Sequence, residues 1–182
     1  MVAARTRYDL VAMTLHWLVV ALIIASWAMG LYMVDLPFSP QKLKFLSWHK
    51  WLGVTIFITA LFRITWRGTH PIPPPPDSMS PWQRTAMGVS HLLLYLLIIF
   101  IPITGWLFSS ASGIPTVYLG WIQIPDAVAR DKLFAGLLRQ AHFSLNLMLF
   151  VIVCVHVAAA LKHHFFDRDD VLARMLPFLR RR

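Results

Sequence analysis

Eight histidines stand out in a chain that otherwise contains few ionisable side chains. Five of them lie inside long apolar runs, where an ionisable residue is costly and therefore indicates a functional site. These five are His16, His49, His91, His142 and His156. The spacing of 14 residues from His142 to His156 corresponds to almost four helical turns, or about 21 Å along one helix face. One helix is therefore predicted to present an imidazole near each membrane surface.

Each of these two imidazoles has a partner at the same depth on another helix. His49 matches the depth of His142, and these two are called the outer pair. His16 matches the depth of His156, and these two are called the inner pair. Neutral imidazole is a good iron ligand, and two axial histidines fill both open positions of a haem iron. The pattern predicts two bis-histidine haems, which are suited to electron transfer rather than oxygen activation. His91 is an alternative to His16 as a ligand of the inner iron.

Other chemistry fits the pattern less well. A lone buried histidine usually has a structural role, but four at paired depths favour iron ligation. Zinc is disfavoured because no cluster of carboxylates or thiolates accompanies the histidines. A single cysteine, Cys154, excludes a disulfide framework, a CxxC redox pair and covalent haem attachment through CxxCH. His70 and His164 are interpreted as surface residues.

Two glycines are candidates for the close approach of a flat macrocycle to a helix backbone. Gly53 follows His49 by four residues, and Gly105 follows His91 by 14 and so shares its face at the outer haem level. Gly30, 14 residues after His16, is interpreted as ordinary packing of small residues between helices.

Basic residues on the same helix faces are candidates for binding haem propionates. Arg63 lies 14 residues after His49, so it faces inward at the inner haem level, where a propionate could pair with it bidentately. The alternative is an arginine that snorkels to the membrane rim. Lys42 shares a helix face with His49, and Arg139 shares one with His142, so both could bind the outer propionates. The alternative for each is again a basic side chain that snorkels to the membrane rim.

His163 lies seven residues after His156, on the same face and at the level of the lipid headgroups. It could contact a quinone or a propionate, although an interfacial histidine without a ligand is the more common situation.

Four apolar runs position these residues, and each is long enough to span a bilayer, for which about 20 residues suffice. They predict helices over residues 11–33, 41–66, 82–108 and 128–164, in one membrane domain covering 1–182. The first run is too long for a signal-peptide core and lacks a cleavage site, so it is expected in the mature protein. Ser39-Pro40 and Ser80-Pro81 are typical helix starts, and Asp126 is a candidate cap for the fourth helix. The predicted fold is all-α, an antiparallel four-helix transmembrane bundle that encloses two haems.

Composition supports a membrane protein. Hydrophobic residues make up 58% of the chain and charged residues 14%, against about 45–50% and 25% in soluble proteins. The net charge of +9 is attributed to basic flanks of membrane helices rather than to nucleic-acid binding.

The basic residues also predict the orientation. Eleven of them fall on the side of the termini and six on the other, so both termini are expected in the cytoplasm. The eleven are Arg5, Arg7, Arg63, Arg67, Arg84, Lys162, Arg168, Arg174, Arg180, Arg181 and Arg182. The six form a positive outer rim: Lys42, Lys44, Lys50, Arg130, Lys132 and Arg139. This rim either contacts lipid phosphates or attracts an anionic reactant.

Several short motifs, in this order and spacing, resemble the bacterial cytochrome b561 family of four-helix dihaem membrane cytochromes. The motifs are RYD at 7–9, HW at 16–17, HKWLG at 49–53, RITWR at 63–67, HLLLY at 91–95, PITG at 102–105, GIP at 113–115, His142 and HVAAALKHHF at 156–165. The resemblance covers nearly the whole chain. It implies that the axial ligands are His16, His49, His142 and His156, in agreement with their depths.

The resemblance also implies a function. Similar members exchange electrons with membrane quinone, and some oxidise superoxide at the outer face and reduce ubiquinone. The chain is therefore expected to be an oxidoreductase of the bacterial inner membrane that carries two noncovalent b haems. Longer relatives are membrane subunits of hydrogenases and formate dehydrogenases, so an electron-transfer anchor for a periplasmic enzyme is the alternative. A transporter with structural haem is a third hypothesis.

The anionic reactant is expected at the positive outer rim. Quinone is expected to enter from the lipid near the inner haem, where Arg63 and His163 could bind its carbonyl oxygens or supply protons. In the alternative arrangement, Arg63 binds only a propionate and quinone binds on the outer side.

Overall fold

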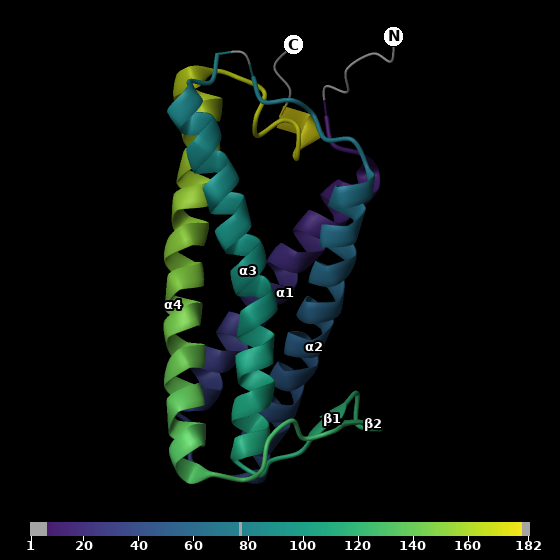
Figure 1. Cartoon of the computed structure of the whole chain (residues 1–182), viewed down its shortest axis with the longest axis vertical. Coiled ribbons are helices and arrows are strands. Elements are labelled where there is room, and N and C mark those ends of the chain that lie inside the picture. The colour runs from purple at the N-terminus through teal and green to yellow at the C-terminus, as the bar shows by residue number, and fades with distance from the viewer. Residues whose placement is uncertain (1–6, 77, 180–182) are drawn as a thin grey trace.

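Four long helices make up most of the computed structural model, which describes residues 7–76 and 78–179. The helices are α1 (Leu10–Val34), α2 (Pro40–Thr69), α3 (Pro81–Ala111) and α4 (Lys132–Lys162), and they run antiparallel in a bundle (Figure 1). All four are long and apolar enough to cross a membrane. The predicted four-helix transmembrane fold is confirmed. Four basic residues assigned to the inner side, Arg5, Arg180, Arg181 and Arg182, lie outside the described residues.

The predicted starts of α2 and α3 are confirmed by their capping contacts. The Ser39 side chain accepts a hydrogen bond from the backbone N–H of Lys42, and Pro40 follows it in the first turn. At α3, the backbone N–H of Ser80 donates to the Gln83 side chain over 2.8 Å, which forms a capping box.

The predicted start of α4 at residue 128, capped by Asp126, is wrong. The helix begins at Lys132, and the Asp131 side chain caps it by accepting from the N–H of Phe134. The backbone N–H of Asp131 donates to the carbonyl of Ala111, which ties this segment to the end of α3. Asp131 has an extended backbone and its N–H is bonded to α3, so the helix begins after it. At its other end α4 continues as a π-helical turn, His163–Asp167.

The connection between α3 and α4 contains an antiparallel hairpin that the sequence did not predict. Strands β1 (Thr116–Tyr118) and β2 (Ile122–Ile124) pair across a turn in which Leu119 and Gly120 both have positive φ. Positive φ at both central residues is typical of the tightest hairpin turns. The short hairpin lies beside the N-terminal half of α2 (Figure 1).

The four helices do not pack equally. Helix α3 packs along α4, α1 packs along α2, and α2 packs along α3. Within the described ranges, no Cα atom of α4 lies within 8 Å of one in α1 or α2. Side chains, rather than close backbones, must therefore bridge the space between α4 and these two helices.

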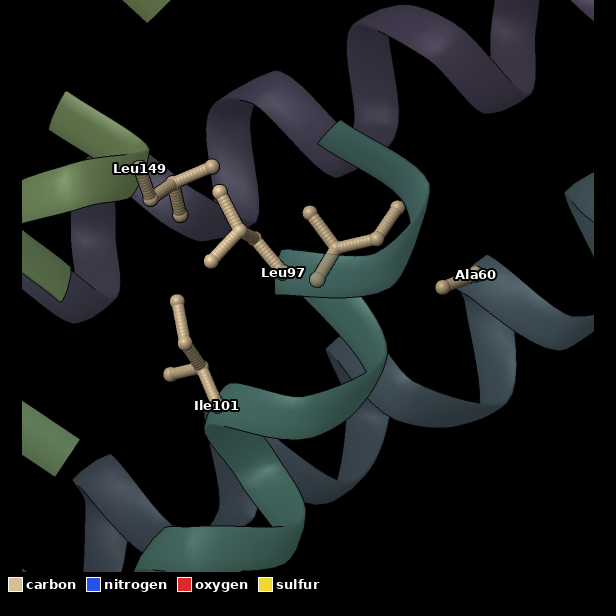
Figure 2. Close-up of a cluster of buried hydrophobic side chains, with 5 residues drawn as sticks. Ala60, Leu97, Ile101 and Leu149 are labelled. Atoms are coloured by element: carbon tan, nitrogen blue, oxygen red, sulfur yellow. The ribbon is translucent and has the colours of Figure 1, made fainter. Parts of the chain in front are cut away.

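A buried apolar cluster occupies the middle of the bundle (Figure 2). It joins Ala60 of α2, three residues of α3 and Leu149 of α4, which lies midway between His142 and His156. The three α3 residues are Leu97, Ile98 and Ile101. The cluster therefore separates the two levels at which the paired histidines lie.

Candidate functional site

The outer pair of histidines is brought together as predicted. The ring centres of His49 on α2 and His142 on α4 lie 6.3 Å apart, with the ring planes at 82°. A metal–imidazole bond is about 2 Å long and the bonded nitrogen lies about 1 Å from the ring centre, so two imidazoles on opposite sides of one ion are about 6 Å apart. The separation fits a metal between the two rings.

The inner level contains three histidines rather than two. The ring centres of His16 and His156 are 6.4 Å apart, whereas those of His91 and His156 are 5.4 Å apart. The longer separation matches the outer pair, and the shorter one leaves less room for an ion between the rings. The geometry therefore favours His16 over His91 as the partner of His156.

Backbone carbonyls orient both outer rings. His49 Nδ1 lies 3.2 Å from the carbonyl oxygen of Ser26, and His142 Nδ1 lies 3.0 Å from that of Ile101. Each contact requires the proton on Nδ1, because a carbonyl can only accept. The lone pair of each ring is then on Nε2, the arrangement typical of a histidine that binds a metal.

The glycines near the outer pair have different surroundings from those expected. A Cβ built on Gly105 would lie 3.0 Å from His142 Cε1, and one built on Gly30 would lie 3.4 Å from His49 Cε1. Gly30, interpreted from the sequence as helix packing, thus packs against a histidine ring. A Cβ on Gly53 would meet nothing within 4 Å, so that residue leaves open space beside His49.

That open space belongs to a cavity with an empty volume of about 410 Å³, lined by both outer histidines and Gly53 among mainly apolar residues. Three further residues with polar side-chain groups line it, Ser26, Trp27 and Asn146, and the sequence analysis missed all three. The indole of Trp27 donates to the Asn146 side chain over 3.0 Å, and Asn146 donates to the backbone carbonyl of His142. The available signal was an amide in an apolar helix, one turn after a candidate ligand.

Two arginines, rather than one, lie near the inner level. The guanidinium carbons of Arg63 and Arg67 lie 5.8 and 5.9 Å from the centre of the Tyr95 ring. Within the described part of the chain neither forms an ion pair, and both line a second cavity of about 350 Å³. Arg67 was missed as a site residue, although its spacing of four from Arg63 places both on one helix face.

The same cavity is bordered by Asp9, the N-cap of α1. Burial acts to raise the pKa of its carboxyl group, but hydrogen bonds from the backbone N–H of Ala12 and the indole of Trp66 favour the ionised form. The net effect holds the pKa of Asp9 below its ordinary value. His70, interpreted as a plain surface residue, stacks on Trp66 with ring centres 3.7 Å apart.

The outer basic residues have distinct contacts. Lys42 Nζ donates to the carbonyls of Leu36 and Val34, so this ammonium group stabilises the end of α1. Arg139 is exposed, and it has no recorded hydrogen bond or ion pair within residues 7–76 and 78–179. Of the two residues proposed for the outer propionates, Arg139 is therefore the one whose charge is available.

His163 contacts two carboxylate groups that the sequence analysis did not predict as its partners. Its Nδ1 is 2.6 Å from Asp169 Oδ2 and 3.2 Å from Asp167 Oδ2. Lys162 also pairs with Asp167 over 2.6 Å. The two aspartates orient the His163 ring at the end of α4.

The chain is similar to known proteins over nearly its whole length. The family model for prokaryotic cytochrome b561 matches residues 7–178. Cytochrome b561 homolog 2 of Escherichia coli strain K12 is 37% identical over 171 residues, covering 93% of this chain and 91% of that protein. A probable superoxide oxidase, CybB, of Yersinia pestis is 30% identical over 176 residues, covering 94% and 96%. Cytochrome b561 homolog 1 of E. coli K12 is 26% identical, covering 94% and 97%.

Proposed function

Because the chain belongs to the prokaryotic cytochrome b561 family of bacterial membrane electron-transfer proteins that bind b-type haem, we propose that it carries two haems and moves electrons across the membrane. The observation that carries the proposal is the pair of imidazole separations, 6.3 Å at the outer level and 6.4 Å at the inner level. Haem b, held between two imidazoles, supplies a one-electron centre with no vacant position for oxygen.

We assign the outer haem to His49 and His142 and the inner haem to His16 and His156. The Nδ1–H contacts of the outer histidines support their assignment, because they leave Nε2 free to bind iron. Gly53 leaves room beside His49 for the macrocycle. Arg63 and Arg67 would bind propionates of the inner haem, and Arg139 would serve the outer one.

The proposed electron donor is superoxide at the outer face, and the proposed acceptor is ubiquinone. The relative from Yersinia pestis is described as a probable superoxide oxidase, which supports the donor. Two superoxide anions would each lose one electron and become two O₂. One ubiquinone would take up those two electrons and two protons and become ubiquinol. The positive outer rim would attract the anionic donor.

Quinone is apolar and would enter from the lipid. We place it near the inner haem, where His163 and Arg63 could donate hydrogen bonds to its carbonyl oxygens. The carboxylate pair on His163 supports this placement, because a histidine held by two aspartates is well oriented to relay a proton. With both termini in the cytoplasm, those protons would come from the cytoplasmic side.

The alternative function, a membrane anchor for a periplasmic dehydrogenase or hydrogenase, has one observation in its favour. The tip of the hairpin exposes Trp121 by 77% and Leu119 by 49%, and this apolar tip lies at the outer end of the bundle. A stable one-to-one complex with a large periplasmic subunit, recovered on mild solubilisation, would support the anchor over the stand-alone enzyme.

The decisive experiment offers an enzymatic source of superoxide to the purified protein with ubiquinone present, and measures ubiquinol. We expect ubiquinol formation that superoxide dismutase abolishes and that the His142→Ala variant lacks. Ubiquinol formation that persists with the dismutase would exclude superoxide as the donor. Protein that contains both haems but forms no ubiquinol would contradict the proposed enzyme and favour the anchor.

A further inference from the structure

The outer ligands His49 and His142 make the same contact with two different helices. The carbonyl that accepts from His49 Nδ1 belongs to Ser26, and the glycine against the same ring is Gly30, four residues later. On α3, the carbonyl that accepts from His142 Nδ1 belongs to Ile101, and the glycine against that ring is Gly105, again four residues later. The repetition on α1 and α3 indicates a common physical requirement.

Helix geometry explains the spacing of four residues. In an α-helix the carbonyl of one residue points at the residue four positions later, and every Cβ leans toward the helix N-terminus. A side chain at that later position therefore covers the outer side of the carbonyl. Glycine leaves the carbonyl open, so an imidazole from a neighbouring helix can reach it while the carbonyl also accepts its bond within the helix.

Hydroxyl groups complete both contacts. The Ser26 hydroxyl lies 3.3 Å from His49 Nδ1, and the Thr104 hydroxyl lies 3.2 Å from His142 Nδ1. Thr104 also donates to the Ile101 carbonyl over 2.8 Å. Each Nδ1–H thus faces a carbonyl and a hydroxyl oxygen on one helix, which fixes both the tautomer and the rotation of the ring.

We propose that Ser26–Gly30 and Ile101–Gly105 are paired cradles that position the two iron ligands of the outer haem. The inference rests on the proposed function, because it concerns the ligands assigned there. Helices α1 and α3 supply no ligand at this level, yet each would aim the ligand of another helix at the iron. Such hydrogen-bonding partners typically change metal affinity by about 10- to 100-fold.

The two cradles differ in tightness. A Cβ at position 105 would lie 3.0 Å from Cε1 and 3.3 Å from Nδ1 of His142, whereas one at position 30 would lie 3.4 Å and 3.8 Å from the same atoms of His49. An alanine at position 105 would displace the His142 ring from the Ile101 carbonyl. An alanine at position 30 would lie in ordinary van der Waals contact with the His49 ring and would displace it little.

The test compares Gly105→Ala and Gly30→Ala with Gly88→Ala, a control in α3 whose added Cβ would meet nothing within 4 Å. Haem content, electron paramagnetic resonance and redox titration are measured on each purified variant. We expect Gly105→Ala to shift the resonance and midpoint potential of the centre lost in His142→Ala, and to lower its haem affinity by about 10- to 100-fold. Gly30→Ala should shift the same centre less, and Gly88→Ala should match the natural protein.

Thr104→Val provides a second variant, which removes the hydroxyl with little change of shape and tests the cradle even if Gly105→Ala does not fold. We expect it to shift the same centre's potential while both haems remain bound. Unchanged resonance and potential in Thr104→Val, and in Gly105→Ala where it folds, would overturn the cradles and leave the ligands intact. If His142→Ala itself retained both haems, the ligand assignment would be wrong, and the cradles would have no iron ligand to position.

Discussion

At the scale of single residues, the distances at the inner level distinguish two histidines that are chemically equal candidates for the second ligand of the inner iron. His16 and His91 both approach His156, at 6.4 and 5.4 Å between ring centres. Only the first separation is close to the 6.3 Å of the outer pair. Under the proposed assignment, His91 would pack against the His156 ring rather than bind the iron.

This distinction predicts opposite results for two alanine variants. His16→Ala should lose one haem per chain, because an axial ligand is removed, whereas His91→Ala should retain both. The measurement is haem content per purified chain together with the low-spin spectrum. Retention of both haems in His16→Ala, with loss of one in His91→Ala, would reverse the inner assignment.

A second prediction at this scale concerns Arg63 and His163. Arg63→Ala and His163→Ala should each slow quinone reduction by about 10- to 150-fold and affect donor oxidation less. The basis is that a hydrogen bond to or from a charged group contributes about 1.5–3 kcal/mol. Rates of both half-reactions, measured per bound haem, provide the check. Arg84→Ala is the control, since Arg84 donates to the backbone carbonyls of Met79 and Pro76.

The outcome for Arg63 separates its two proposed roles. If Arg63→Ala lowers only the content of the inner haem and leaves quinone reduction per haem unchanged, Arg63 binds a propionate alone. Quinone would then be assigned to the outer side.

At the scale of elements, the hairpin is fastened to α2 immediately after His49. The Trp51 indole donates to the Val117 carbonyl over 2.7 Å, and the Thr55 and Tyr118 hydroxyls lie 3.0 Å apart. Lys50 Nζ donates to the carbonyls of Ile114 and Pro115. The hairpin therefore stabilises the outer turns of α2, where one iron ligand is predicted to lie.

Removing these contacts should weaken the outer half of the bundle. Trp51→Phe and Thr55→Val should each cost about 1 kcal/mol, the usual net contribution of a hydrogen bond, and lower the apparent Tm by about 2–4 °C. Thermal loss of haem absorbance in detergent measures the effect. Trp121→Phe, at the exposed tip of the hairpin, should not change the Tm. Equal effects of all three variants would contradict a specific role for the α2 contacts.

At the scale of the whole molecule, the positive outer rim predicts how the donor arrives. Donor oxidation should slow as salt is added, because exposed charges are screened beyond about 8 Å at physiological ionic strength. Arg139→Glu should slow it further and should leave quinone reduction unchanged. The measurement is the initial rate of haem reduction by superoxide at several ionic strengths. A rate indifferent to both salt and Arg139→Glu would remove the electrostatic attraction from the proposal.

The orientation of the bundle is a separate prediction. With Cys154 first replaced by Ala, an impermeant thiol reagent should label Gln123→Cys on β2 in intact spheroplasts. A cysteine added after Arg182 should react only once the membrane is opened, because the C-terminus is predicted in the cytoplasm. Labelling of the C-terminal cysteine in intact spheroplasts would contradict the orientation.

The sequence by itself determined the four apolar spans and the relative heights of the histidines along them. Hydrophobic length fixes where a helix crosses, and the constant rise of 1.5 Å per residue fixes the level of His49, His142, His16 and His156 within it. The caps at Ser39 and Ser80 were also predictable, because capping depends on neighbours within one helical turn.

Only the tertiary structure decided which side chains meet at each level. The preference for His16, the approach of Gly105 to His142 and the pairing of His163 with Asp169 all depend on the rotation of one element against another. The start of α4 and the hairpin depend in the same way on bonds to distant backbone. Helical periodicity specifies a face and a height for each residue, but not the distance between two helices or the rotation of a ring, because long-range packing and hydrogen bonds set both.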